Sequence, residues 1–299
     1  MIEYLGDVHL ITCFGLLFGA IAGSFINVCA FRIPRNKSVV FPPSSCPKCE
    51  QSIAWYRNIP LLSWLAQRGR AACCSFNIPA RYFWVELITS LSFAYFFRLS
   101  ILSLSWDIGI VGCVFSFILI SVIIIDLETM TIPDRFSMGG AIIGLIFSFA
   151  YPSLHSFEGV DIFSRLHSLF TSLMGLLIGS SVLYWIGAFA YRVFDRDALG
   201  EGDVKLLGCI GAFCGWKGAI FTIFGGAMVG CAMLIPLMIF QKVKARGVDT
   251  IDNPVSWGQE VPFGPYLAVA ALIFFAGMNE FVDKWLSVKL VPILNVIGS

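Results

Sequence analysis

Residues 108–126 read IGIVGCVFSFILISVIIID, an apolar run with no charged side chain until Asp126 ends it. About 20 apolar residues suffice to cross the hydrocarbon core of a membrane as an α-helix. This run therefore predicts a transmembrane helix, which we place at residues 107–125, so that Asp126 directly follows it. Seven further runs have the same character, at about 10–31, 83–104, 136–151, 167–190, 206–222, 223–240 and 263–282. We predict an all-α, polytopic membrane protein with about eight transmembrane helices. Seven is the alternative, because only residues 216–218 interrupt the sixth and seventh runs.

The composition of the 299-residue chain agrees with this prediction. It is 58% hydrophobic and 13% charged, whereas soluble domains carry roughly 25% charged residues. A soluble enzyme, a disordered protein and a nucleic-acid binder are therefore excluded, and membrane lipid is the expected surrounding. The first ten residues contain Glu3 and Asp7 but no Lys or Arg, so the first apolar run is predicted to be a retained span rather than a cleaved signal peptide.

The basic residues predict the orientation of the chain. Residues 32–82 contain eight Lys and Arg against one acid, Glu50, and basic loops stay in the cytoplasm. Alternating from there, 15 of the 20 basic residues lie on the cytoplasmic side. We predict a first span at 1–31, a cytoplasmic insert at 32–82 and a membrane body at 83–299. Gly15, Gly19 and Gly23, four residues apart in the first span, predict a close helix–helix contact.

Scarce acids lie at the predicted cytoplasmic boundary. Asp126 ends one span, and Gly200-Glu201-Gly202-Asp203 opens another 77 residues later. Each acid also has a structural interpretation: Asp134 after Pro133 fits the first turn of a helix, and Asp203 fits a helix cap. Ionisable residues at membrane depth are nevertheless functional candidates.

Two neighbouring carboxyl groups do not both ionise easily, so they share one proton. This is the working state of an aspartic protease, in which one carboxylate activates water and the other carboxyl group polarises the scissile carbonyl. A serine-protease arrangement is not favoured, because all three histidines are predicted at or beyond the outer boundary: His9, His155 and His167.

Ordered motifs along most of the chain resemble those of the type IV prepilin peptidases, membrane aspartic proteases of the Gly-x-Gly-Asp class. The matching segments are residues 23–28 (GSFINV), 32–34 (RIP), 46–49 (CPKC), 58–64 (NIPLLSW), 68–70 (RGR), 85–87 (VEL), Asp126 with 132–134 (IPD), 200–207 (GEGDVKLL) and 262–265 (PFGP).

The resemblance implies a bifunctional enzyme of the bacterial inner membrane. Such an enzyme cleaves the leader of prepilins or pseudopilins after a Gly on the cytoplasmic face, and methylates the new N-terminus with S-adenosyl-L-methionine. Its products serve type IV pili or type II secretion. By the matching motifs, Asp126 and Asp203 are the catalytic pair. A member that has lost methylation is the first alternative, and an ion-coupled transporter is a remote one.

The remaining residues around both motifs are predicted to bind the substrate. The acids at this boundary form an acidic rim that attracts a basic leader, and this rim consists of Asp126, Glu128, Asp134, Glu201 and Asp203. The predicted substrate-binding residues are Glu128, Asp134, Gly200, Glu201, Gly202 and Lys205.

Four cysteines share the insert: Cys46, Cys49, Cys73 and Cys74. Two Cys-x-x-Cys pairs, as relatives usually have, suit a tetrahedral zinc ion, but here Ala71 stands where the third cysteine is expected. A four-cysteine zinc site using Cys73, a three-cysteine or vestigial site, and a redox pair all remain open.

Overall fold

The computed structural model describes residues 2–46, 48–157, 159, 161–195, 199–245, 261–279, 281–282 and 284. Within these ranges the chain is helical and has no strand, only two isolated β-bridges. The all-α prediction is confirmed. The chain divides into two compact units, Met1–Phe136 and Ser137–Ser299. The division predicted from sequence is a different one, because it separates the chain into a first span, a cytoplasmic insert and a membrane body. That division stays a prediction.

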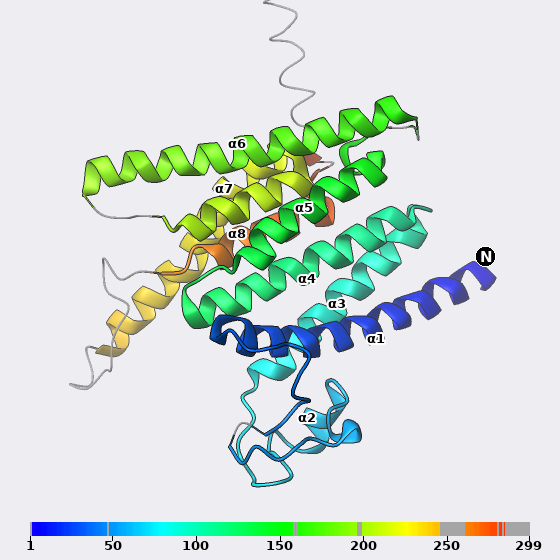
Figure 1. The fold of residues 1–299 in the computed structure, drawn as a ribbon, viewed down its shortest axis with the longest axis vertical. Coiled ribbons are helices and arrows are strands. Elements are labelled where there is room, and N and C mark those ends of the chain that lie inside the picture. Colours follow the sequence, from blue (N-terminus) through cyan, green and yellow to red (C-terminus); the bar gives the residue numbers. More distant parts are fainter. Residues whose placement is uncertain are drawn as a thin grey trace, which may run out of the picture. The chain divides into compact units, whose positions relative to one another are not determined.

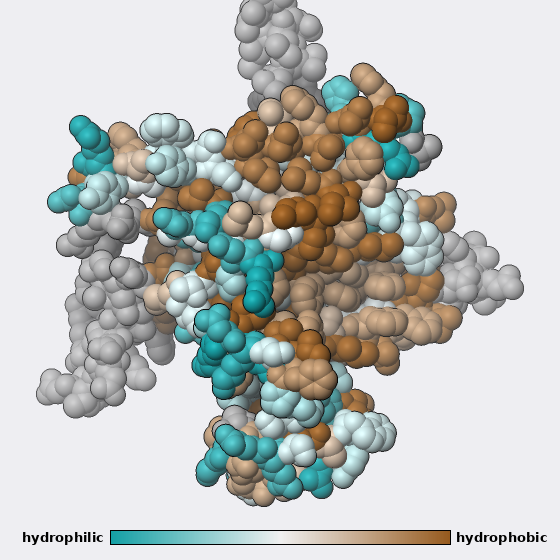
Figure 2. Space-filling model, in the orientation of Figure 1, coloured by the Kyte–Doolittle hydropathy of each residue, from teal (hydrophilic) through white to brown (hydrophobic). Residues whose placement is uncertain are grey.

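The first unit contains three long helices, α1 (Ile2–Arg32), α3 (Arg81–Leu102) and α4 (Trp106–Thr129), which lie side by side in Figure 1. The insert joins α1 to α3 and contains only short helices: η1 (Ile33–Arg35), η2 (Trp55–Arg57) and α2 (Leu62–Ala66). Figure 2 shows mainly brown, hydrophobic residues over the long helices and mainly teal and white residues over the insert. Among the described residues, α1 ends at Arg32 and α3 begins at Arg81, and the place of the insert relative to the membrane stays a prediction.

The three glycines of α1 form its contact with α3, as predicted. A Cβ on Gly15 would lie 2.8 Å from Ala94 Cα, and one on Gly19 would lie 2.6 Å from Ser90 Cα. Gly23 meets Glu86 in the same way. The order of these contacts makes α1 and α3 antiparallel, so the end of α1 and the start of α3 lie at one end of the unit.

The second unit contains α5 (Asp134–Ala150, its first turn in the first unit), η3 (Pro152–His155), α6 (Ile162–Phe194), α7 (Glu201–Ala245), α8 (Gly264–Ile273) and the π-helical turn η4 (Phe274–Met278). Glycine again permits the closest crossing: a Cβ on Gly175 of α6 would collide with the backbone of Gly211 in α7.

A kink at Gly215 interrupts α7. This residue has φ 66° and ψ −178°, in a region that glycine adopts without the steric penalty of a Cβ. Polar side chains gather at the kink: the Ser172 hydroxyl donates to the Ala212 carbonyl (2.6 Å), and Ser148 Oγ lies 3.3 Å from that carbonyl and 3.1 Å from His155 Nε2. These hydroxyls satisfy a backbone group that an uninterrupted helix would satisfy itself.

The count of eight spans is not confirmed. Five helices among the described residues are long and apolar enough to cross a membrane, and the segment Gly264–Met278 is a shorter apolar helix. The predicted sixth and seventh spans lie within the single helix α7, whose kink falls at Gly215 rather than between residues 222 and 223. Most of the predicted cytoplasmic loop 241–262 lies outside the described residues.

Candidate functional site

Asp126 lies in the last turn of α4. The apolar run before it packs inside the first unit, and Asp126 itself is only 4% exposed. The helix ends because Met130 adopts a left-handed conformation (φ 51°) and its N–H donates to the Asp126 carbonyl (2.9 Å). The carboxyl group is therefore buried on a helix end, as the sequence predicts.

Glu128 forms an ion pair with Arg81, the first residue of α3. Both side chains are partly exposed. The pair joins the end of α4 to the point where the insert re-enters the helices. Sequence reasoning placed Glu128 in the acidic rim and did not assign a role to Arg81, because the two residues are distant along the chain.

Glu86 is a second buried carboxylate, which sequence reasoning placed in a matching motif but not in the catalytic or binding site. It is 8% exposed, and its Oε2 accepts the backbone N–H of Leu61 at 2.7 Å. The hydroxyl of Ser24 in α1 also hydrogen-bonds to it. Glu86 therefore ties the insert to α1 and α3. An acid inside an apolar stretch was the available signal.

Asp203 lies in the first turn of α7 and is 8% exposed. Its Oδ2 accepts the N–H of Gly200 at 3.3 Å, and its own N–H donates to the Gly200 carbonyl at 3.1 Å. The expectation that Asp203 caps a helix after a glycine turn is confirmed. A carboxylate there is also stabilised by the helix dipole.

The other predicted site residues lie close to these two acids in their own units. In the first unit, Asp134 is exposed at the start of α5, where the sequence predicts a first-turn acid. In the second unit, Gly200 and Glu201 are exposed, and Gly202 and Lys205 are half-buried. Asp126 and Asp203 belong to different units, and their pairing stays a prediction.

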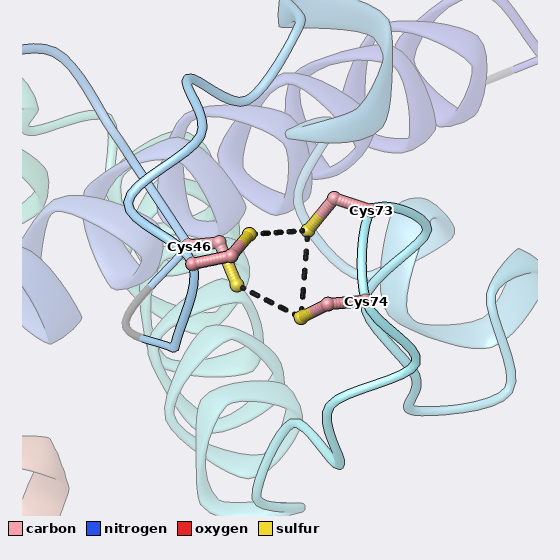
Figure 3. A group of neighbouring side chains, drawn as sticks. Cys46, Cys73 and Cys74 are labelled. Atoms are coloured by element: carbon pink, nitrogen blue, oxygen red, sulfur yellow. Dashed lines mark hydrogen bonds between the residues drawn. The ribbon is translucent and has the colours of Figure 1, made fainter.

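The four insert cysteines form one cluster. Their Sγ atoms all lie within 4.8 Å of one another, with separations of 3.6 Å for Cys46–Cys74, 3.3 Å for Cys49–Cys73 and 3.8 Å for Cys73–Cys74. Figure 3 shows the labelled thiols pointing toward a common centre. A zinc ion with Zn–S bonds of about 2.3 Å places its four sulfur atoms about 3.8 Å apart, so this donor set fits such an ion.

Two similar turns present these thiols, which we call knuckle 1 (residues 46–50) and knuckle 2 (residues 71–75). The same two backbone hydrogen bonds close each turn. In knuckle 1, the N–H of Glu50 donates to the Cys46 carbonyl (2.9 Å) and the N–H of Cys46 donates to the Gln51 carbonyl (2.9 Å). In knuckle 2, the N–H of Ser75 donates to the Ala71 carbonyl (2.8 Å) and the N–H of Ala71 donates to the Phe76 carbonyl (2.8 Å).

The equivalence of the knuckles explains the departure at Ala71. Ala71 occupies the place of Cys46, and Cys74 occupies the place of Cys49. Cys73, one residue earlier, turns its thiol toward Cys49 and completes the cluster. The fourth thiol is therefore present, but from a shifted position.

Backbone N–H groups favour the thiolate form of one of the four cysteines, Cys46. The N–H groups of Cys49 and Lys48 lower the pKa of Cys46 to about 6, whereas hydrogen bonding with neighbouring thiols, led by Cys49, raises the pKa of Cys73 to about 12. A metal ion binds the thiolate form, so the surroundings of Cys46 favour the form that a metal binds, and those of Cys73 do not.

Apolar helices carrying buried carboxyl groups at their ends define a membrane protein with an ionisable site. Two family models match the chain in order: the bacterial peptidase A24 N-terminal domain over residues 17–99, and the type IV leader peptidase family over residues 113–235. The chain therefore belongs to the type IV leader peptidase family and is a bacterial membrane enzyme.

Several relatives carry the name prepilin leader peptidase/N-methyltransferase. The protein of Myxococcus xanthus (strain DK1622) is 35% identical over 84% of this chain and 70% of its own length. The protein of Pectobacterium carotovorum subsp. carotovorum is 32% identical over 90% of this chain and 94% of its own length. No solved structure matches the chain significantly.

Proposed function

We propose that this protein cleaves the leader of prepilins or pseudopilins after a Gly on the cytoplasmic face, and then methylates the new N-terminal amine with S-adenosyl-L-methionine. The observation that carries the proposal is the match of both family models in order on one chain. Relatives named for both activities, similar over most of their length, support it.

For the peptidase step, Asp126 and Asp203 act as a pair that shares one proton. The ionised carboxylate takes a proton from water, and the resulting hydroxide attacks the scissile carbonyl, which the protonated carboxyl group polarises. Burial of both side chains supports this role, because it shields the reacting groups from bulk water. Each lies at a helix end, which suits a bond located near the membrane surface.

For the substrate, the acidic rim attracts the basic leader. Asp134 and Glu201 are exposed, so their charges reach solvent and act over about one Debye length, roughly 8 Å at physiological salt. The glycine turn of Gly200 and Gly202, together with Lys205, lets an extended chain approach Asp203. Glu128 contributes less, because Arg81 already neutralises it.

For the insert, Cys46, Cys49, Cys73 and Cys74 hold a zinc ion that joins knuckles 1 and 2. The ion would supply a structural cross-link between the two halves of the insert. The sulfur separations near the tetrahedral edge support this assignment over a redox pair.

The test is processing of a prepilin in membranes, with cleavage followed by gel shift and methylation followed by transfer of labelled methyl groups. Asp126→Asn and Asp203→Asn are each expected to abolish cleavage. Asp161→Asn is the matched control, since Asp161 only caps the start of α6. Full cleavage by either of the first two variants would reject the catalytic pair.

A further inference from the structure

The insert lies alongside the last turns of α1. One pocket of about 320 Å³ is lined both by α1 residues between Ile21 and Arg32 and by insert residues within 39–44 and 58–60. Eleven positions separate Ile21 from Arg32, which is about 16 Å along a helix. Figure 1 likewise shows the insert beside the C-terminal part of α1 rather than beyond its end. The insert therefore reaches back along a helix that is long and apolar enough to cross a membrane.

The sequence of α1 indicates the membrane depth of this contact. Residues 10–31 contain no charged side chain, and as a helix they extend about 33 Å, close to the roughly 30 Å thickness of the hydrocarbon layer. A span of this length places Arg32 near the surface of the hydrocarbon layer and Ile21 inside it. Insert segments that line one pocket with both of these residues therefore lie at the level of the lipid headgroups.

Large aromatic side chains project from these insert segments. Phe41 lies within the lining segment 39–44, and the N–H of the lining residue Asn58 donates to the Trp55 carbonyl (3.0 Å). Phe41 is 74% exposed and Trp55 is 80% exposed. Tyr56, whose ring meets that of Trp55 edge to face, is exposed as well. Because Trp and Tyr combine an apolar ring with a polar group, they are enriched where a membrane meets water, and a headgroup layer suits these side chains better than water.

Basic side chains accompany the aromatic rings. The guanidinium carbon of Arg57 lies 5.6 Å from the centroid of the Tyr56 ring. At the end of α1, the guanidinium carbon of Arg35 lies 4.3 Å from the centroid of the Phe31 ring, and Lys37 Nζ lies 5.9 Å from it. All three basic residues are exposed, and the whole insert contains eight Lys and Arg against one acid. Such an excess of positive charge attracts an anionic membrane surface that lies within about one Debye length.

We propose that the insert binds the anionic phospholipid headgroups of the leaflet beside the end of α1. The contact surface, which we call the headgroup face, consists of Arg35, Lys37, Phe41, Trp55, Tyr56 and Arg57. The rings enter the headgroup layer, and the guanidinium and ammonium groups bind lipid phosphates. The occupant is lipid rather than a soluble protein, because the contact with α1 holds this face at the level of the membrane whether or not a partner is present.

The headgroup face lies at the same end of the first unit as Asp126. α1 and α3 are antiparallel, and Arg81, where the insert re-enters the helices, pairs with Glu128 near the end of α4. The insert is thus attached at both of its ends, to headgroups beside α1 and to an ion pair beside α4. Lipid binding of this kind does not depend on either proposed enzymatic activity.

The test measures the emission of Trp55 in the full chain. The protein is placed in nanodiscs of mixed phosphatidylglycerol and phosphatidylcholine, in which one of the two lipids carries bromine on its acyl chains close to the headgroup. Bromine quenches tryptophan at short range, and the emission of Trp55 is the difference between the wild type and Trp55→Phe. We expect brominated phosphatidylglycerol to quench this emission about twofold more strongly than brominated phosphatidylcholine, because the basic residues concentrate anionic lipid around Trp55.

Two triple variants with the same change in net charge test the basic residues of the headgroup face. Arg35→Gln, Lys37→Gln and Arg57→Gln together are expected to abolish the preference of Trp55 for brominated phosphatidylglycerol. The matched control combines three exposed basic residues of the insert that lie outside the headgroup face, as Lys48→Gln, Arg68→Gln and Arg70→Gln. It is expected to keep the preference.

Amide hydrogen exchange of the wild type in the same nanodiscs requires no variant. Slower exchange within residues 35–43 and 53–57 when phosphatidylglycerol is present than in phosphatidylcholine alone supports the proposal. Emission of Trp55 that neither brominated lipid quenches overturns it, and leaves the headgroup face to an acidic soluble protein. Equal quenching by both lipids, or a preference that the first triple variant retains, overturns the binding of anionic headgroups by these residues.

Discussion

The glycine contact between α1 and α3 allows a quantitative prediction for Gly19→Ala. A Cβ at this position would lie 2.6 Å from Ser90 Cα, 2.7 Å from Thr89 O and 2.8 Å from Phe93 Cβ. Ordinary contacts begin near 3.4 Å, and none of these atoms can rotate away, because all belong to the backbone or the first side-chain carbon of α3. The two helices must therefore separate by roughly 1 Å.

Overpacking of this kind costs about 1–3 kcal/mol, and alanine returns about 1 kcal/mol through its higher helix propensity. Since three rigid atoms are involved, we take the upper part of the range and expect a net loss of about 2 kcal/mol in the free energy of unfolding. The assay is reversible unfolding in mixed micelles, with SDS as the denaturant and tryptophan fluorescence as the readout.

Gly139→Ala in α5 is the matched control. A Cβ there meets nothing within 4 Å, so only helix propensity acts, and stability is expected to rise by up to about 1 kcal/mol. If Gly19→Ala proves as stable as Gly139→Ala, the close approach of α1 and α3 is wrong.

Three further predictions concern other contacts. In a double-mutant cycle, Arg81→Gln and Glu128→Gln are expected to couple by about 0.5–1 kcal/mol in the free energy of unfolding, as partly exposed ion pairs do; zero coupling would show that the pair does not form. Cys73→Ser is expected to lower the zinc content measured by mass spectrometry while Cys13→Ser retains it, and a folded wild type without metal would end the zinc assignment. Burial lowers the pKa of His155 to about 4, below its unfolded value of about 6.5, so as the pH falls from about 6.5 towards 4 the unfolded state binds a proton that the folded state does not. Stability should therefore decline over this range more steeply in the wild type than in His155→Gln, and parallel curves would contradict the burial.

Local patterns in the sequence predicted much of this structure because they act over short distances. The spacing of Gly15, Gly19 and Gly23 marks one helix face, and the contact with α3 follows. The position of Asp203 in the first turn of a helix follows from the glycine turn before it. The cysteines predicted that the two ends of the insert could meet at one site, and their four Sγ atoms do lie within 4.8 Å of one another.

The unpredicted features depend on backbone angles or on distant partners. Glycine is common in membrane helices, and a sequence does not show which one adopts φ 66°, so residues 216–218 predicted a break between two spans rather than a kink at Gly215 within one helix. The Arg81–Glu128 pair and the Leu61–Glu86 bond each join residues far apart along the chain. The sequence left open whether Cys73 replaces the missing thiol at Ala71, because the answer depends on where its side chain points: its Sγ lies 3.3 Å from Cys49 Sγ in the other knuckle.

The kink in α7 also limits where Asp203 and Gly215 can lie relative to the two surfaces of a membrane. Twelve positions separate Asp203 from Gly215, which is about 18 Å along a helix. The hydrocarbon layer is about 30 Å thick, and any tilt shortens the reach further. The carboxyl group and the kink therefore cannot both touch water across a bilayer of ordinary thickness. Unless the protein thins the lipid around this arm of α7, the depths of the two groups below the surfaces of the hydrocarbon layer add up to at least about 12 Å.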